Sequence, residues 1–168
     1  MKTKYSAFIF FALIIFALVL PLLYYSKLSN NIAVHFNAGG QADGWVSKKS
    51  FLMTQEILTL SIAVLFGTLA FLVSLLPESI INMPNKDYWL NDENISETYK
   101  LLQKSFLWFG SITIAFIALV FQETIAANLS GSNKLNGMFW IYLVVYFLLV
   151  TIYLVKFIMH FSKKNIPG

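Results

Sequence analysis

The chain has 168 residues, of which 58% are hydrophobic and only 12% are charged. Because soluble domains carry about 25% charged residues, this composition excludes an ordinary soluble protein and predicts a membrane protein. The chain has no cysteine, which excludes disulfides and thiolate metal sites. Its twelve basic residues are all lysines, the net charge is +4, and no basic run is interleaved with aromatic residues, so nucleic acid is not an expected partner.

The first apolar segment runs from Tyr5 to Ser26 without a charged residue. At about 1.5 Å per residue, a helix of this length spans a hydrocarbon core of about 30 Å. A secretory signal peptide is the competing interpretation, but its apolar region is normally about 7–15 residues long and is followed by a small-residue cleavage site. We therefore predict a retained transmembrane helix over residues 5–26, which tolerates Pro21 near its end.

A polar, glycine-rich loop follows over residues 27–50 and is too polar to cross a bilayer. It contains His35, one of only two histidines, and three glycines within six residues, which predicts a tightly turning backbone. The next apolar segment predicts a second span over residues 51–76, with Glu56 near its start.

The second connection covers residues 77–104 and contains Tyr88 and Trp89, whose amphipathic rings suit the headgroup level. From residue 92 onward, apolar residues recur at spacings of three and four, so we expect a short amphipathic helix that continues into a third span over residues 105–123. Glu123 lies at the far end of that span, and a polar connection over residues 124–136 follows. The fourth predicted span covers residues 135–156.

Four spans joined by short loops predict an all-α fold: an integral membrane four-helix bundle, forming one domain over residues 1–168, with a structured outer loop between the first two helices. An open sheet is not stable in lipid, and no alternation of apolar and polar residues supports a barrel.

The lysines predict the orientation, because cytoplasmic segments of membrane proteins collect basic residues. With four spans, both termini share one side, which would carry eight lysines against four on the other and would therefore be cytoplasmic. The eight are Lys2, Lys4, Lys86, Lys100, Lys104, Lys156, Lys163 and Lys164. This orientation places His35, Asp43, Glu56 and Glu123 at the outer face, where ionisable groups close to a bundle are functional candidates.

The loop resembles the signature of a family of small bacterial membrane proteins, the domain of unknown function 1648. The resemblance rests on the pattern His35-Phe36-Asn37-x-x-Gly40-x-x-Asp43-Gly44-Trp45-x-Ser47-Lys48 and on a second segment, Met83-Pro84-Asn85-Lys86-Asp87-Tyr88-Trp89. In this chain Ser29 and Ala33 replace two prolines that are usual before the histidine, so the entry into the loop is less stiff. The immunity protein against the sporulation-delaying toxin of Gram-positive bacteria contains a distantly related domain. The resemblance thus implies a bacterial cytoplasmic-membrane protein with a role similar to immunity or signalling.

The candidate ligand-binding residues are those of the first motif: His35, Asn37, Gly40, Asp43, Gly44, Trp45 and Lys48. A second set comprises Pro84, Asn85, Tyr88 and Trp89. His35 either binds a ligand, metal or proton or only shapes the turn, and Asn37 and Asp43 are equally good turn formers. Trp45 suits an interfacial anchor, and Lys48 suits either a headgroup phosphate or a solvated position. A metal site would use His35, Asp43, Glu56 and Glu123, although their spacing matches no known metal motif.

These residues leave three functional hypotheses open. The first is a non-enzymatic membrane protein whose outer loop binds or senses a peptide, a protein partner or a lipid. The second is a membrane-embedded, metal-assisted enzyme, although no nucleophile and base are paired in the sequence. The third is a small transporter subunit, for which homo-oligomerisation would have to supply the pathway. No cofactor is identified by the sequence, and membrane lipids are expected partners in every case.

Overall fold

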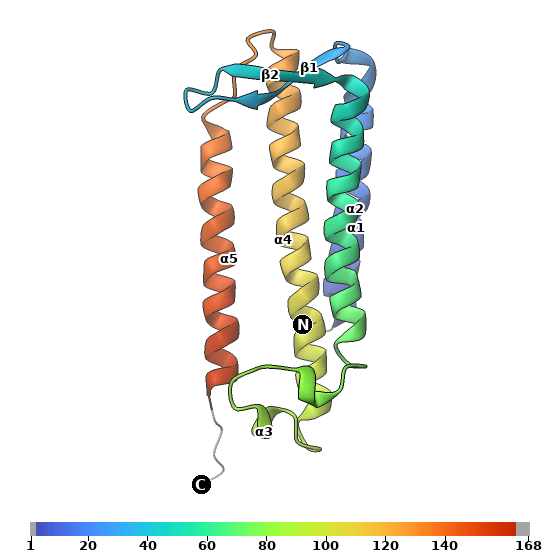
Figure 1. Ribbon diagram of the computed structural model, residues 1–168, viewed down its shortest axis with the longest axis vertical. Helices are drawn as coiled ribbons and strands as arrows, with labels where there is room; N and C mark the ends of the chain where they lie inside the picture. The colour runs from blue at the N-terminus through green and yellow to red at the C-terminus, as the bar shows by residue number, and fades with distance from the viewer. Residues whose placement is uncertain (1–2, 164–168) are drawn as a thin grey trace.

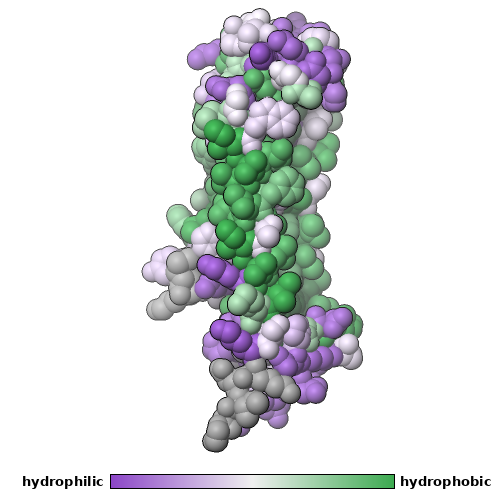
Figure 2. Space-filling model, turned by 90° about the vertical axis from the view of Figure 1, so that its left-hand side faces the viewer, coloured by the Kyte–Doolittle hydropathy of each residue, from purple (hydrophilic) through white to green (hydrophobic). Residues whose placement is uncertain are grey.

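The computed structural model describes residues 3–163, so Lys2 and Lys164 of the predicted cytoplasmic set lie outside the described residues. Four long helices run side by side along one axis (Figure 1): α1 (Thr3–Tyr24), α2 (Lys48–Leu72), α4 (Ile95–Leu129) and α5 (Met138–Ser162). Each is long and apolar enough to cross a membrane. Figure 2 shows a broad hydrophobic band between two polar ends. The predicted all-α membrane fold with four spans is confirmed.

The limits of the helices differ from those of the predicted spans. The helix α4 has 35 residues, or about 52 Å at 1.5 Å per residue, and therefore extends beyond the hydrocarbon core. Its unbroken course from Ile95 confirms that the amphipathic stretch continues into the third span. The predicted connection over residues 124–136 was wrong, because α4 continues to Leu129. The helix α5 begins at Met138 rather than at residue 135, because residues 133–135 form backbone hydrogen bonds with the outer loop.

The loop between α1 and α2 has regular secondary structure. After a 3₁₀ turn (Tyr25–Lys27), it forms an antiparallel hairpin of β1 (Asn31–Phe36) and β2 (Ala42–Ser47), which lies across the end of the bundle (Figure 1). The sequence analysis did not predict these strands. Ile32 faces the bundle and packs in a cluster with Leu28, Phe51 and Ile125. At the opposite end, a 3₁₀ turn (Glu78–Ile80) and a short helix α3 (Lys86–Trp89) connect α2 to α4.

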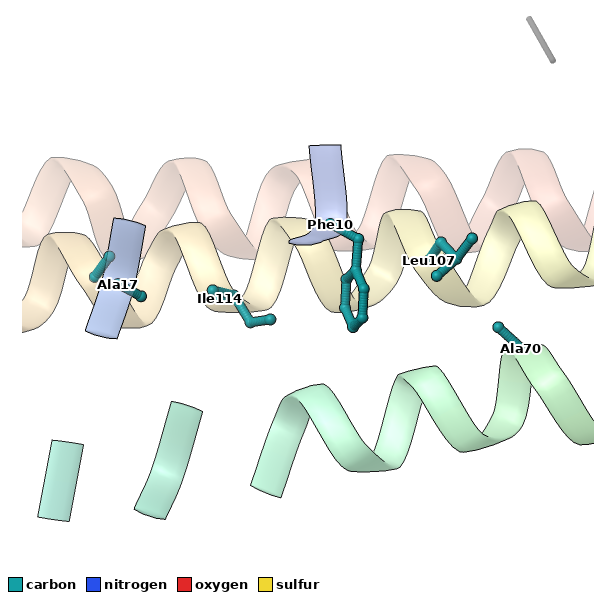
Figure 3. Packing of buried hydrophobic residues seen from close by; sticks show 6 residues of the cluster. Phe10, Ala17, Ala70, Leu107 and Ile114 are labelled. Atoms are coloured by element: carbon teal, nitrogen blue, oxygen red, sulfur yellow. The ribbon is translucent and has the colours of Figure 1, made fainter. Parts of the chain in front are cut away.

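The core of the bundle lies between α1, α2 and α4. The ring of Phe10 projects from α1 into a cluster that includes Ala70 of α2 and Leu107 and Ile114 of α4 (Figure 3). The ring fits there because Gly110 has no side chain: an added Cβ would lie 2.5 Å from Phe10 Cε2 and 2.8 Å from Phe66 Cβ. The close approach of three helices therefore depends on one glycine.

A proline explains a polar contact inside this core. Pro21 lies within α1 and has no N–H, so the carbonyl of Ala17, four residues earlier, lacks its helical partner. Gln55 of α2 donates from Nε2 to this carbonyl over 2.6 Å, and its side chain is fully buried. The side chain of α2 thus replaces the backbone donor that α1 lacks, as expected where no water is present.

The helix α5 is more loosely integrated and packs mainly along α4. Tyr146 stacks on Phe116 with ring centroids 4.2 Å apart, and Tyr153 meets Phe109 edge-on at 4.7 Å. Phe161 is the one residue of α5 that is buried. Most of the surface of α5 therefore faces the surrounding lipid.

Candidate functional site

The turn of the hairpin is organised by Asn37. Its Oδ1 accepts hydrogen bonds from the backbone N–H groups of Gly39 (2.9 Å) and Gln41 (3.1 Å), an arrangement that asparagine favours in turns. Gly40 takes a left-handed φ of 77°, which suits glycine. Asn37 therefore forms the turn, which is one of the roles that the sequence analysis considered for it.

The turn is tied to the loop between α4 and α5. Leu135 N donates to Gly40 O over 2.9 Å, and Ala42 N donates to Asn133 O over 3.0 Å. An added Cβ at Gly40 would lie 3.4 Å from the carbonyl oxygen of Leu135. The hairpin and the start of α5 therefore hold each other in place through backbone groups.

The strand β1 is docked on α4 by Asn128, a residue that the sequence analysis did not identify. Ala33 N donates to Asn128 Oδ1 over 2.8 Å, and Asn128 Nδ2 donates to Ala33 O over 2.9 Å. The amide thus acts like one residue of a neighbouring strand. An asparagine in the last two turns of an apolar helix is the only sequence signal that could have indicated it.

Replacing Asn128 with alanine should loosen the hairpin without unfolding the bundle. The buried N–H and carbonyl of Ala33 would lose their partners, at a cost of about 1–3 kcal/mol each where water does not replace them. Hydrogen exchange of the hairpin amides should become faster while the amides of α1 and α2 stay protected. Asn31→Ala, an exposed asparagine on the same strand, is the control. Equal exchange rates in the two variants would contradict the docking role.

Lys48 stabilises the end of the first span. Its Nζ donates to the carbonyls of Tyr25 (3.2 Å) and Leu28 (3.0 Å) and lies 4.5 Å from the centre of the Tyr25 ring. A cation is favourable at such a chain end, where helical carbonyls lack partners. These contacts give Lys48 a structural role that the two alternatives expected from the sequence, a headgroup phosphate or a solvated position, did not include.

His35 and Asp43 form the one polar pair on the outer surface of the hairpin. His35 Nδ1 and Asp43 Oδ1 are hydrogen bonded, and the two side chains are 75% and 43% exposed. The strand register is irregular on both sides of His35, and such bulges re-aim side chains. An added Cβ at Gly44 would lie 2.8 Å from His35 Cβ, so Gly44 gives the histidine its place across the hairpin. Trp45 follows, with 47% of its surface exposed.

The predicted four-residue metal set does not assemble. Within residues 3–163, no group of three or more histidine and carboxylate side chains is close enough to hold a metal ion. His35 and Asp43 meet, but Glu56 lies in the third turn of α2, and Glu123 lines a separate groove beside α4. The hypothesis of a metal-assisted enzyme built on these four residues therefore fails on geometry.

The second motif lies at the other end of the bundle, where it caps α5. Asn85 Nδ2 donates to the carbonyls of Phe161 (3.0 Å) and Ser162 (2.9 Å), and Trp89 Nε1 donates to Phe161 O over 2.9 Å. Tyr88 meets the ring of Trp89 edge-on, and Pro84 is exposed. These are carbonyls of the last helical turn, which have no partner within the helix. The two sets of motif residues thus lie at opposite ends of the bundle.

Comparison with known families supports the resemblance at the first motif. Residues 12–55 match the model of a family described as "Domain of unknown function (DUF1648)". This segment covers the second half of α1, the whole hairpin and the first turns of α2, which supports the resemblance seen in the sequence. The second motif lies outside the match. No curated protein and no solved structure matches the chain.

Proposed function

We propose that this chain is a non-enzymatic, multi-pass protein of the bacterial cytoplasmic membrane whose hairpin binds a cationic, membrane-active peptide at the outer face. One observation carries the proposal: one set of motif residues fixes the backbone of the hairpin, and another set is exposed on its surface. Asn37, Gly40 and Lys48 have contacts that hold the backbone. His35, Asp43 and Trp45 are exposed, and the hydrogen bond between His35 and Asp43 across the hairpin is the polar side-chain contact that they have.

The exposed set has the chemistry to receive a basic side chain. Asp43 supplies a carboxylate, and Trp45 supplies the aromatic face on which lysine and arginine are bound most strongly. His35 fixes the carboxylate through Nδ1 and keeps its other ring nitrogen available for a peptide group. Because Asn128 and the loop before α5 hold the hairpin rigidly, little conformational freedom would be lost on binding.

The orientation is part of the proposal. Of the described lysines, six lie at the end of the bundle that holds the termini, namely Lys4, Lys86, Lys100, Lys104, Lys156 and Lys163. Four lie at the hairpin end, and one of them, Lys48, is engaged with backbone carbonyls. The excess at the terminal end supports cytoplasmic termini and an external hairpin. This arrangement would let the hairpin meet a peptide before the peptide enters the bilayer.

Trp45→Ala and Asp43→Asn should abolish protection against such a peptide. Cells without the gene are expected to be more sensitive to one or more cationic amphipathic peptides, and the wild-type gene should restore tolerance. A central aromatic anchor contributes about 2 kcal/mol or more to binding, so its removal should weaken peptide affinity about 30-fold. Complementation is measured as the lowest inhibitory peptide concentration, with membrane levels of each variant checked by immunoblot.

Trp140→Ala is the matched control, because Trp140 is a tryptophan at the same end of the bundle with 45% exposure, but lies on α5 away from the motif. It should complement fully. If the Trp45 and Asp43 variants also restore full tolerance at normal membrane levels, or if deletion changes no sensitivity across the panel, the proposed function is wrong.

A further inference from the structure

A second polar site lies beside the bundle at the hairpin end, in the angle between α4 and the loop that leads to α5. It is a groove of about 420 Å³, lined on one side by Glu123 and Ser130 of α4 and on the other by Ser132, Lys134 and Asn136 of the loop. None of these residues belongs to the hairpin. The loop is tied to the hairpin turn by backbone hydrogen bonds, but the groove includes none of the exposed residues of the peptide site proposed above.

The height of Glu123 follows from the packing of α4 on α5. The two helices are antiparallel, and Phe109 packs on Tyr153 while Phe116 packs on Tyr146. A step of seven residues up α4 therefore reaches the same height as a step of seven residues toward the start of α5. Seven further residues place Glu123 level with Phe139, next to Trp140. Tryptophan is typical of the membrane–water interface, so the groove lies at headgroup level.

The charges in the groove are not paired with each other. Glu123 is half-buried, yet within residues 3–163 its carboxylate forms neither an ion pair nor a hydrogen bond, and Lys134 lines the same groove without reaching it. Because Glu123 lines the groove, its carboxylate is available to a cationic group. Asn136 accepts a hydrogen bond from Met138 N through Oδ1, which leaves its Nδ2 donor for a ligand. The groove therefore offers a negatively charged acceptor, Glu123. Separately, it offers the cation of Lys134 and the amide donor of Asn136.

We infer that this groove binds the headgroup of a phospholipid with a primary ammonium, of the phosphatidylethanolamine class. The ammonium would bind Glu123, and the phosphate would bind Lys134 Nζ and Asn136 Nδ2. No aromatic ring is among the residues lining the groove, and aromatic cages are what recognise a quaternary ammonium, so a choline headgroup fits less well. A glycerol headgroup has no cation for Glu123 and brings a second negative charge beside it. The acyl chains would lie along the apolar, lipid-facing surface of α5 (Figure 2).

Competitive lipid retention tests this inference. The purified full chain in detergent is mixed with equal amounts of phosphatidylethanolamine, phosphatidylcholine and phosphatidylglycerol, and bound lipids are counted by native mass spectrometry. The wild type should retain the ethanolamine lipid preferentially. Glu123→Gln should reduce this retention about tenfold, because a hydrogen bond to a charged group is lost, and Lys134→Gln should reduce it similarly.

Glu56→Gln and Lys49→Gln are the matched controls, since both charges lie at the same end of the bundle outside the groove. They should leave the preference unchanged. If Glu123→Gln unfolds the chain, Lys134→Gln still tests the lipid preference, because Lys134 is exposed in the loop and its substitution should leave the fold intact. The inference is overturned if the ethanolamine lipid is retained no better than the other two, or if the groove and control variants behave alike. If free O-phosphoethanolamine raised the thermal unfolding midpoint as much as the ethanolamine lipid does, the ligand would be soluble and the lipid assignment would be overturned.

Discussion

Gly110→Ala is expected to destabilise the bundle by about 1–3 kcal/mol, which is the usual cost of forcing an extra carbon into a well-packed core. The new Cβ would lie 2.5 Å from Phe10 Cε2 and 2.8 Å from Phe66 Cβ. Neither neighbour can move freely, because the Phe10 ring is 1% exposed and the Cβ of Phe66 is fixed to the backbone of α2. The separation of α1, α2 and α4 would have to increase. Thermal unfolding of the purified chain in detergent should show a clearly lower midpoint.

The matched control is Gly67→Ala on α2. An added Cβ there would lie 3.8 Å from Phe10 Cε1, which is an ordinary van der Waals contact. Alanine is also preferred over glycine in a helix by about 1 kcal/mol, so this variant should be neutral or more stable. Equal midpoints for the two variants would contradict the proposed steric role of Gly110. A larger residue, as in Gly110→Val, should lower the midpoint further than alanine does.

The helices could be predicted because their signal is local. An uncharged run such as Tyr5–Ser26 is long enough to cross a bilayer, and lipid leaves the backbone of a single segment no stable alternative to a helix. Helix ends were less predictable, because they depend on contacts distant in sequence. Leu135 looks like the start of an apolar span, yet its N–H donates to Gly40 O, and α5 begins three residues later.

The hairpin could not be predicted for a related reason. The segment Asn31–Phe36 has no alternation of apolar and polar residues, and it becomes a strand because β2 pairs on one edge and Asn128 satisfies Ala33 on the other. The first motif lies within the segment that matches the family model, but the contacts of its members could not be predicted from the sequence. The contacts of Lys48 with two carbonyls come from the course of the chain after α1.

The prediction that Glu56 and Glu123 lie close together was wrong, because the sequence of an apolar span contains little information on which face of the helix is buried. When nearly all positions are hydrophobic, no stripe shows which face is buried. The buried polar residues are better guides in retrospect. Gln55 is fully buried beside Ala17, which places the neighbouring Glu56 on a different face of α2.

Trp89→Ala should detach the last turns of α5 from the bundle. The substitution removes the ring contacts with Phe161 and His160, at 5.3 and 5.1 Å between centroids, together with the hydrogen bond to Phe161 O. Loss of a large aromatic side chain from a fully buried site costs about 3–5 kcal/mol, and Trp89 is partly buried, so the cost should lie at or below the lower end of this range. The rest of α5 packs along α4 and has no other buried residue, so the contacts of Trp89 and Asn85 and the burial of Phe161 are what hold this end in place. Hydrogen exchange over residues 157–162 should accelerate strongly, while the hairpin stays protected.

Two smaller substitutions separate packing from hydrogen bonding at this end. Trp89→Phe keeps an aromatic ring and loses the indole donor, which should cost about 0.5–1.5 kcal/mol. Asn85→Gly removes the donors to Phe161 O and Ser162 O, while glycine still accepts the left-handed φ of 51° that this position requires. The expected order of exchange rates is therefore Trp89→Ala, then Asn85→Gly, then Trp89→Phe, with Trp140→Ala at the other end of α5 indistinguishable from wild type. If Trp89→Ala left residues 157–162 protected, the second motif would not be what anchors α5, and its residues would be free for a ligand.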